Sequence, residues 1–341
     1  MKGKKRWLLL GMCVGLLSLC SCTARPEISE MLIISGAGID YTQDGVQLSV
    51  QAQHAEADPA SIFLQTEAAT VSEAMDLLTE ETGKVVVTSQ TMVLVVGQSG
   101  VTQDHIGSLY DAACELQLRP DVLVLLAEEE AGALLGARDE QGNLLPVDDL
   151  QSISKNGLRN GKGLPVRLMD WYNEFYGEAG NAFLPQIGYR QEGGWLYQGT
   201  QLFDKEGRKA LWLSDQETAL YAAITGKNDT FLYTLPQKEA SSVQLSLTGS
   251  TDLQPGESLL LNVNIQGYYT ARGQMPDEED VNRLIRQDCE ALLQKMEKAG
   301  CLSFLWEKAL LWQDTDRFRQ IKESGTQPDV SWQTSVQFTA R

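Results

Sequence analysis

Two apolar segments, KVVVTSQTMVLVV at residues 84–96 and DVLVLL at residues 121–126, determine the fold class of this chain. The first is rich in Val and Thr and the second in Val and Leu, so both predict buried β-strands. Between them, apolar side chains recur at helical spacing over residues 106–116, and Arg119-Pro120 ends that pattern. A short helix is expected at Glu128–Leu135. Strands that alternate with helices indicate a mixed α/β region.

The residues before this region predict a strand pair and a capped helix. Met31–Ile39 is an apolar strand with glycines where backbones approach closely, and Val46–Gln53 alternates apolar and polar side chains. Asp44-Gly45 between them is a hairpin turn signal. Thr70 and Glu73 form a capping box at the start of the next helix.

Residues 136–165 differ from what precedes them, because Gly and Asn accumulate and few side chains are apolar. This composition predicts a loop or linker between two lobes. We therefore expect an N-terminal α/β region at residues 22–190, which this linker would divide into two subdomains. A C-terminal α+β domain is expected at residues 191–341.

The C-terminal region predicts a mainly antiparallel sheet with one long helix packed on it. Ser214 and Glu217 form a second capping box, for a helix through Thr225. The longest helix has an acidic opening turn at Asp277–Asp280, and Gly300 can end it in left-handed geometry. The expected strands are Trp195–Phe203, Ala210–Leu213, Val243–Leu247, Leu259–Tyr269 and Val330–Phe338. An amphipathic helix is expected at Leu168–Tyr176, and a shorter apolar helix at Leu302–Leu311. The fold class is therefore α+β, with several domains and mixed sheets.

The first 22 residues predict export and lipidation. Four basic residues precede an apolar run of 13 residues, Trp7–Leu19, which is shorter than the roughly 20 residues that span a bilayer. Leu19-Cys20-Ser21-Cys22 fits a bacterial lipobox, so residues 1–21 are the expected lipoprotein signal peptide and Cys22 the lipidated residue. Attached acyl chains would hold the protein at the membrane. Ordinary secretion with cleavage nearby is the alternative.

The charge of the chain argues against some classes of partner. The precursor has a net charge of −18, and removal of the four signal cations leaves 24 basic and 46 acidic residues, a net charge of −22. A surface this acidic repels nucleic acid and anionic lipid headgroups.

The residues that commonly carry catalysis or bind metals are few. Cys114, Cys289 and Cys301 are expected to be buried free thiols, because their number is odd and no CxxC or Cys/His cluster is present. His54 and His105 are expected to be incidental polar residues. These observations predict neither a disulfide framework nor a metal site.

Two glycine-containing motifs resemble catalytic loops only superficially. Gly157–Gly163 has three residues between its first glycines where a phosphate-binding loop needs four, and is expected to be a flexible loop. Gly97–Val101 lacks the last glycine of a nucleophile elbow. The acidic clusters Glu128–Glu130 and Asp277–Asp280 open helices. We therefore predict no catalytic residue, no cofactor and no enzymatic activity.

Four aromatic residues lie on one predicted helix: Trp171, Tyr172, Phe175 and Tyr176. Only about half of such a set can face a core. The others could form an exposed contact patch or pack at the rim of the core.

Several segments, in this order, resemble the Ger(x)C family of spore germination lipoproteins. Cys22–Asp40 resembles the family's lipid-bearing cysteine, R-E-I-like segment and strand ending near G-I-D. Val93–Gly97 and Leu118–Val122 resemble its V-x-x-x-G and R-x-D/E stretches, and Gly199–Glu217 resembles its middle segment. The closing features are the long acidic-to-basic helix, Gly300, Leu305-Trp306, Trp312 and the Val-rich final strand.

Three positions depart from the family pattern. Thr88-Ser89-Gln90 replaces an aromatic-Gly-His segment, Pro26 interrupts the R-E-I-like segment, and Ala210 replaces a glycine. These differences identify the chain as a divergent member.

The resemblance implies the C subunit of a nutrient germinant receptor, which acts by protein–protein contact and is not known to be enzymatic. It implies an anchor on the outer face of the spore inner membrane, through lipid such as palmitate on Cys22, beside integral-membrane A and B subunits. It also implies three mixed α/β domains. Two alternatives stay open: a solute-binding lipoprotein of a transporter, with two similar lobes and a hinge, and an exported hydrolase with acids or a Ser/His pair in a cleft.

Overall fold

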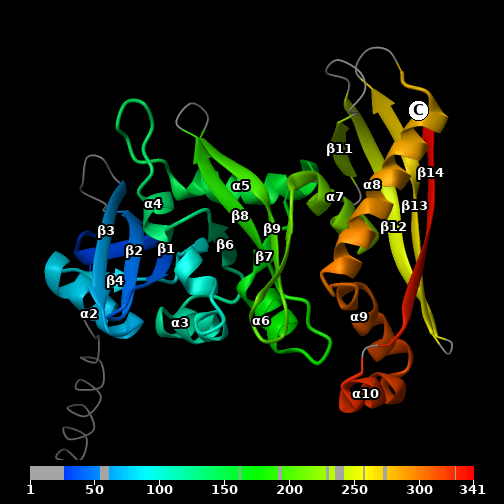
Figure 1. Cartoon of the computed structure of the whole chain (residues 1–341). Coiled ribbons are helices and arrows are strands. Elements are labelled where there is room, and N and C mark those ends of the chain that lie inside the picture. Colours follow the sequence, from blue (N-terminus) through cyan, green and yellow to red (C-terminus); the bar gives the residue numbers. More distant parts are fainter. Residues whose placement is uncertain are drawn as a thin grey trace, which may run out of the picture.

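The computed structural model describes residues 27–53, 61–160, 163–190, 194–227, 230–234, 242–255, 258–271, 275–326 and 328–341. Two sheets organise this part of the chain, one of ten strands and one of four (Figure 1). Helices pack on both sheets, so the α+β fold class with mixed sheets is confirmed.

The larger sheet has the strand order β10-β9-β8-β6-β5-β1-β2-β3, with β4 beside β1 and β7 beside β6. Its strands are β1 (Met31–Tyr41), β2 (Val46–Gln53), β3 (Ser61–Ala68), β4 (Val85–Val87), β5 (Val93–Val96), β6 (Leu123–Ala127), β7 (Val166–Arg167), β8 (Phe183–Arg190), β9 (Gly194–Phe203) and β10 (Lys209–Leu213). The associated helical segments are η1 (Ile28–Glu30), α2 (Val71–Thr82), η2 (Gln98–Val101), η3 (Ile106–Ser108), α3 (Leu109–Glu115), α4 (Ala131–Leu135), α5 (Val147–Asn160) and α6 (Leu168–Tyr176).

Parallel strands form the centre of this sheet. β5 pairs with β1 and with β6, and every residue of β5 and β6 is buried. The segment predicted as one strand at 84–96 is two strands, β4 and β5, which both pair with β1. Residues 88–92 turn between them, and Thr91 Oγ1 donates a hydrogen bond to the carbonyl of Ile34 (3.3 Å).

Asp40, the last residue of the G-I-D segment, joins this sheet to α4. Its carboxylate accepts hydrogen bonds from the backbone N–H groups of Ala131 (3.0 Å) and Gly132 (3.1 Å). Burial raises the pKa of Asp40 above its ordinary value, although these two bonds oppose the rise. Gly97 leaves the room that this arrangement needs, because a Cβ there would lie 1.6 Å from Asp40 Oδ1.

Asp40→Ala is expected to lower the free energy of unfolding by about 1–3 kcal/mol, because two buried N–H groups lose their acceptor. Urea unfolding followed by circular dichroism measures this. The matched control is Asp44→Ala in the neighbouring turn, where the side chain is exposed and the change should stay within about 0.5 kcal/mol. Equal effects of the two substitutions would contradict the role given to Asp40.

The predicted linker at 136–165 is corrected by the structure. Its middle forms α5, whose residues Val147, Leu150 and Ser154 are buried. Gln51 of β2 fixes the start of this helix, because its Oε1 accepts from the N–H of Val147 (2.9 Å). This region therefore forms a helix that packs on the first sheet, where a loop was expected.

The larger sheet also continues past residue 190, where the C-terminal domain was expected to begin. β8 and β9 form an antiparallel hairpin, and β10 pairs with β9. A division after residue 190 would therefore separate two paired strands of one sheet.

The smaller sheet has the order β11-β12-β13-β14. Its strands are β11 (Thr230–Thr234), β12 (Ser242–Pro255), β13 (Leu259–Ala271) and β14 (Val330–Ala340), and its helices are α7 (Asp215–Ile224), α8 (Glu278–Lys298), α9 (Ser303–Gln313) and α10 (Thr315–Ser324). β11, β12 and β13 are antiparallel, whereas β14 pairs with β13 in parallel. The long helix is confirmed as α8, while β3, β11 and α10 had not been predicted.

The second capping box also ties α7 to α8. Ser214 Oγ accepts from the Glu217 N–H, and Glu217 Oε2 accepts from the Ser214 N–H (2.8 Å). Lys295 Nζ of α8 lies 2.8 Å from both oxygens of the Glu217 carboxylate. Burial alone would raise the pKa of Glu217, but the hydrogen bonds from Lys295 and from the Ser214 N–H lower it below its ordinary value.

Glu217→Gln is expected to weaken the dependence of stability on pH at acidic pH. A carboxylate whose pKa is lowered by folding stabilises the fold fully above its unfolded pKa of about 4.5, and this contribution is lost as the pH falls through the folded pKa. Urea unfolding at pH 6, 4.5 and 3 should show a smaller loss for the variant than for the unsubstituted protein. Lys295→Gln should have the same effect, and unchanged profiles for both would contradict the pairing.

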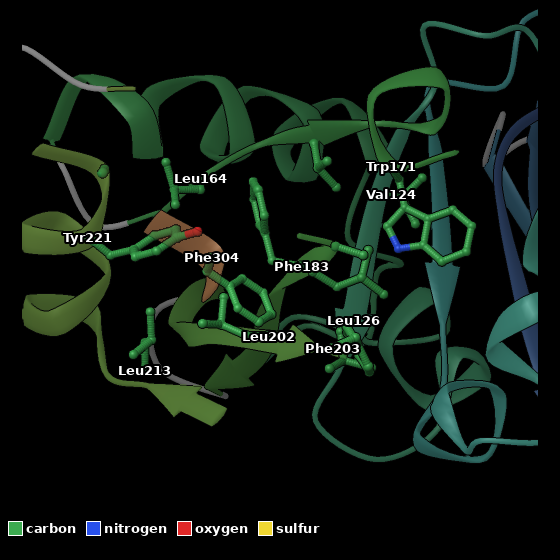
Figure 2. Close-up of a cluster of buried hydrophobic side chains, with 14 of the residues drawn as sticks. Val124, Leu126, Leu164, Trp171, Phe183, Leu202, Phe203, Leu213, Tyr221 and Phe304 are labelled. Atoms are coloured by element: carbon green, nitrogen blue, oxygen red, sulfur yellow. The ribbon is translucent and has the colours of Figure 1, made fainter. Parts of the chain in front are cut away.

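A continuous set of buried apolar side chains extends from the first sheet to the second. It runs from Leu32 of β1 to Phe338 of β14. Figure 2 shows its middle, with Val124 and Trp171 on one side and Tyr221 and Phe304 on the other. The two sheets therefore share one hydrophobic core.

Candidate functional site

Cys22, the predicted lipidation site, lies outside the residues that the structure describes, which begin at Glu27. Four residues of the sequence lie between the two positions. η1 follows, and Lys84 Nζ before β4 donates to the carbonyl of Ser29 (2.6 Å). η1 and β4 therefore lie together at one end of the sheet.

Two large apolar side chains are exposed at this end. Ile28 of η1 is 65% exposed and Val85 of β4 is 47% exposed, and Val85 pairs with Met31. Exposed acidic residues, including Glu27, Glu80 and Glu81, lie nearby in the chain. Isolated apolar residues are normal on protein surfaces, so these two do not form a patch by themselves.

A groove of about 490 Å³ lies where α7, α9 and β12 meet. Tyr221, Ile224, Phe304 and Leu305 give it an apolar lining, and Trp312 of α9 stands at its rim. Trp312 is 80% exposed, the largest exposed fraction among the large apolar side chains of the described residues. A concave apolar surface beside an exposed Trp has the composition of a protein-contact site.

Charged side chains surround this groove. Lys308 Nζ of α9 lies 2.8 Å from Glu174 Oε1 of α6. This ion pair connects a helix on the larger sheet to a helix on the smaller one. Lys227 Nζ lies 4.4 Å from the centre of the Phe183 ring. Burial of this ammonium lowers the pKa of Lys227, although Glu174 opposes the shift. A neighbouring hollow of about 450 Å³ shares Glu174, Lys227 and Lys308.

A second polar cluster connects α9 to the β9–β10 turn and to α10. Glu307 of α9 is only 6% exposed, and Lys322 of α10 donates to its Oε1 (2.6 Å). Lys205 Nζ lies 3.4 Å from its Oε2. Burial lowers the pKa of Lys205, and Glu307 acts against this. The three side chains neutralise one another in part, which explains how a carboxylate can be buried here.

The predicted aromatic patch is mostly packed. Trp171 is fully buried and stacks on Phe175 with ring centres 4.8 Å apart. Tyr172 is half-buried and its ring lies against that of Tyr110 in a tilted arrangement, with ring centres 4.2 Å apart. Tyr176 is 50% exposed, and its hydroxyl donates to the carbonyl of Gly107. Packing at the rim of the core, the second of the two readings, describes this helix.

Two of the three cysteines are buried as predicted, and one is not. Burial raises the pKa of Cys289 to about 12 and that of Cys301 to about 11, so both thiols stay protonated at neutral pH. Cys114 is exposed, because α3 turns this position away from the core. In the described part of the chain, no group of three or more His, Cys, Asp or Glu side chains is placed to bind a metal ion.

The glycine-rich segment at 157–163 has a packing role. A Cβ at Gly157 or Gly163 would come within 2.2–2.3 Å of the Tyr197 ring. The Tyr197 hydroxyl donates to the carbonyl of Ser154 (3.1 Å). Burial of the Tyr197 side chain raises the pKa of Tyr197 to about 12. The segment therefore accommodates an aromatic ring, with Gly157 inside α5; residues 161–162 lie outside the described part.

Of the two histidines, His54 lies outside the described residues. His105 stacks on Tyr41 with ring centres 4.0 Å apart. The acidic residues before α4 have structural contacts: Glu128 accepts from Gln198 Nε2 (2.5 Å), and Glu130 is the residue that precedes the helix. Within the described ranges, none of the helices combines the length and the apolar character needed to cross a membrane.

The sequence analysis did not identify the groove or the Glu307 cluster. Their members come from α6, α7, α9, α10 and two turns, which are far apart in the chain. One signal was present: Trp312 extends the apolar run Ala309–Leu311 past the predicted end of the shorter helix, just before polar residues begin.

Comparison with known proteins gives two matches. Residues 24–189 match the family model described as the spore germination protein N-terminal domain. The crystal structure of the GerBC protein is similar in fold, with a TM-score of 0.51 and 13% sequence identity, over 89% of this chain and 96% of that one. A search of curated proteins found no match. The family match ends next to the hairpin of β8 and β9.

Proposed function

Since this chain belongs, through residues 24–189, to the Ger(x)C family of spore germination proteins, we propose that it is the C subunit of a nutrient germinant receptor. In this proposal, lipid on Cys22 holds it on the outer face of the spore inner membrane. It acts by contact with integral-membrane A and B subunits and catalyses no reaction.

The family match next to the lipobox is the observation that carries this proposal. The matched segment begins two residues after Cys22 and includes Asp40 and Gly97, which form the contact between the first sheet and α4. Tethering at Cys22 would raise the local concentration of the protein at the membrane, so weak docking surfaces could hold a complex together. The groove beside Trp312 is one surface with suitable composition.

Purification of the full chain from spore membranes in mild detergent tests the proposal. We expect A-type and B-type subunits to be recovered with it, identified by mass spectrometry. Spores that lack the chain should lose the response to at least one nutrient, followed as the fall in optical density, while still germinating with a trigger that bypasses receptors. Recovery of neither subunit, together with normal nutrient responses, would contradict the proposal.

The second candidate, a solute-binding lipoprotein of a transporter, finds less support. That class needs two similar lobes around a hinge, whereas the two sheets here have ten and four strands and share one core. Recovery of transporter subunits in the same purification would favour it. An exported hydrolase would need a catalytic cleft; the groove beside Trp312 contains no Ser/His pair, and its one carboxylate, Glu174, is paired with Lys308.

A further inference from the structure

The outward face of the smaller sheet has an unusual composition. α7, α8 and α9 pack on the other face, so alternate residues of β12, β13 and β14 point away from the core (Figure 1). Fourteen of these seventeen outward positions are uncharged and polar, and one, Asp252, is charged. The polar ones are Gln244, Ser246, Thr248, Ser250, Gln254, Asn262, Asn264, Gln266, Thr270, Ser331, Gln333, Ser335, Gln337 and Thr339.

The composition of this face differs from that of the whole chain. Charged residues make up 22% of the sequence, so about four would be expected at seventeen positions, and more on a surface. Lys and Arg are absent from all seventeen positions. A face with one charged residue at seventeen outward positions, on a strongly acidic protein, is therefore a distinct surface.

The polar side chains on this face are arranged around a hollow of about 530 Å³. Asp252 Oδ2 accepts from Ser250 Oγ and from Asn264 Nδ2, each at 3.3 Å, so both bonds reach the same oxygen. On the adjoining strands, Gln333 Nε2 donates to Asn262 Oδ1. The hollow thus presents carboxamides from three strands beside one carboxylate.

The chemistry of the hollow excludes several classes of ligand. Phosphate groups and nucleic acid need cations, and the residues that line the hollow include neither Lys nor Arg. A protein partner needs apolar anchors, and the hollow is lined by polar residues alone. Tyr268 lies on the same face, about two outward positions further along β13 than the hollow. The Arg341 guanidinium stacks on its ring, 4.5 Å from the ring centre.

We propose that this hollow binds a neutral glycan chain whose sugars carry acetamido groups. Asn and Gln carboxamides each offer two donors and an acceptor, which can pair with the N–H and C=O of an acetamido group. The Asp252 carboxylate accepts hydrogen bonds from neighbouring sugar hydroxyls. The site is independent of the receptor role proposed above.

Calorimetric titration of the full lipid-bearing chain in nanodiscs tests this with two soluble oligosaccharides. Chitohexaose, which carries acetamido groups, should bind at least tenfold more tightly than cellohexaose, which has the same linkage without them. Asn264→Ala combined with Gln333→Ala should weaken chitohexaose binding at least tenfold. Gln313→Ala, an exposed carboxamide on α9, is the matched control and should bind as the unsubstituted chain does.

Circular dichroism and thermal unfolding establish that the double variant is folded. Absence of chitohexaose binding to the unsubstituted chain would overturn the proposal. So would unchanged binding by the folded double variant, and equal binding of cellohexaose would overturn the assignment of acetamido groups.

Discussion

Cys22→Ala is expected to move nearly all of the protein from the membrane fraction to the soluble fraction. Two acyl chains hold a protein stably at a bilayer, whereas one chain gives only marginal, reversible binding. Lipidation also requires the thiol of this one residue, so the substitution removes every chain that depends on it. Fractionation followed by immunoblotting measures the distribution.

The control for this experiment is Cys20→Ala, two residues earlier in the predicted signal peptide. It removes a thiol from the same segment but leaves the acceptor, so membrane association should not change. Mass spectrometry of the N-terminal peptide should show lipid on Cys22 in the control. A processed chain whose Cys22 carries no lipid, or membrane association unchanged by Cys22→Ala, would contradict the predicted anchor.

Trp171→Ala is expected to lower the free energy of unfolding by about 3–5 kcal/mol, because it leaves a large cavity in the core that joins the two sheets. Trp171 is fully buried and contacts Phe175 and Tyr176 in stacked and edge-on geometry. Figure 2 places it beside Val124 in the middle of this core. Urea unfolding of the two proteins measures the difference.

Two comparisons make this prediction specific. Trp312→Ala removes the same side chain from a position that is 80% exposed, and should change stability by no more than about 0.5 kcal/mol. Trp171→Phe should cost much less than Trp171→Ala, because Trp171 Nε1 has no hydrogen-bond partner among the described residues to lose. If Trp171→Ala and Trp312→Ala lowered the free energy of unfolding equally, the shared core would not be what stabilises the two sheets.

Elements with strong local signals could be predicted from the sequence. Asp277 caps α8 by accepting from the Glu279 N–H, and the apolar face of that helix is buried from Val281 to Met296. The Ser214–Glu217 box is present with both bonds. At Thr70, the cap bond is present, but Glu73 accepts from the N–H of Ala69, one residue earlier than predicted.

The elements that were missed have weak or masked periodicity. α5 was predicted as a loop because Ser154 and Gly157 occupy its buried face, where small residues make room for Tyr197. Val147 and Leu150 mark that face as apolar, and Ile153 packs against the same core. The tertiary contact, rather than local propensity, forms this helix.

Surface features could be predicted least. The groove beside Trp312 depends on Glu174, Lys227 and Lys308, whose proximity comes from packing of α6, α7 and α9. The outward face of β12–β14 needs the register of three strands to place Asp252 beside Asn264 and Asn262 beside Gln333. No short segment of sequence contains that information.

The parallel pairing of β14 with β13 affects the order in which this protein can be completed. β13 ends at Ala271, and three helices follow before β14 begins at Val330. A ribosome makes the chain from the N-terminus, so the edge of β13 that pairs with β14 stays open until β14 has been made. Unpaired edges of this kind promote association between chains. A nonsense codon shortly before Val330 should therefore yield insoluble protein rather than a shortened, folded one.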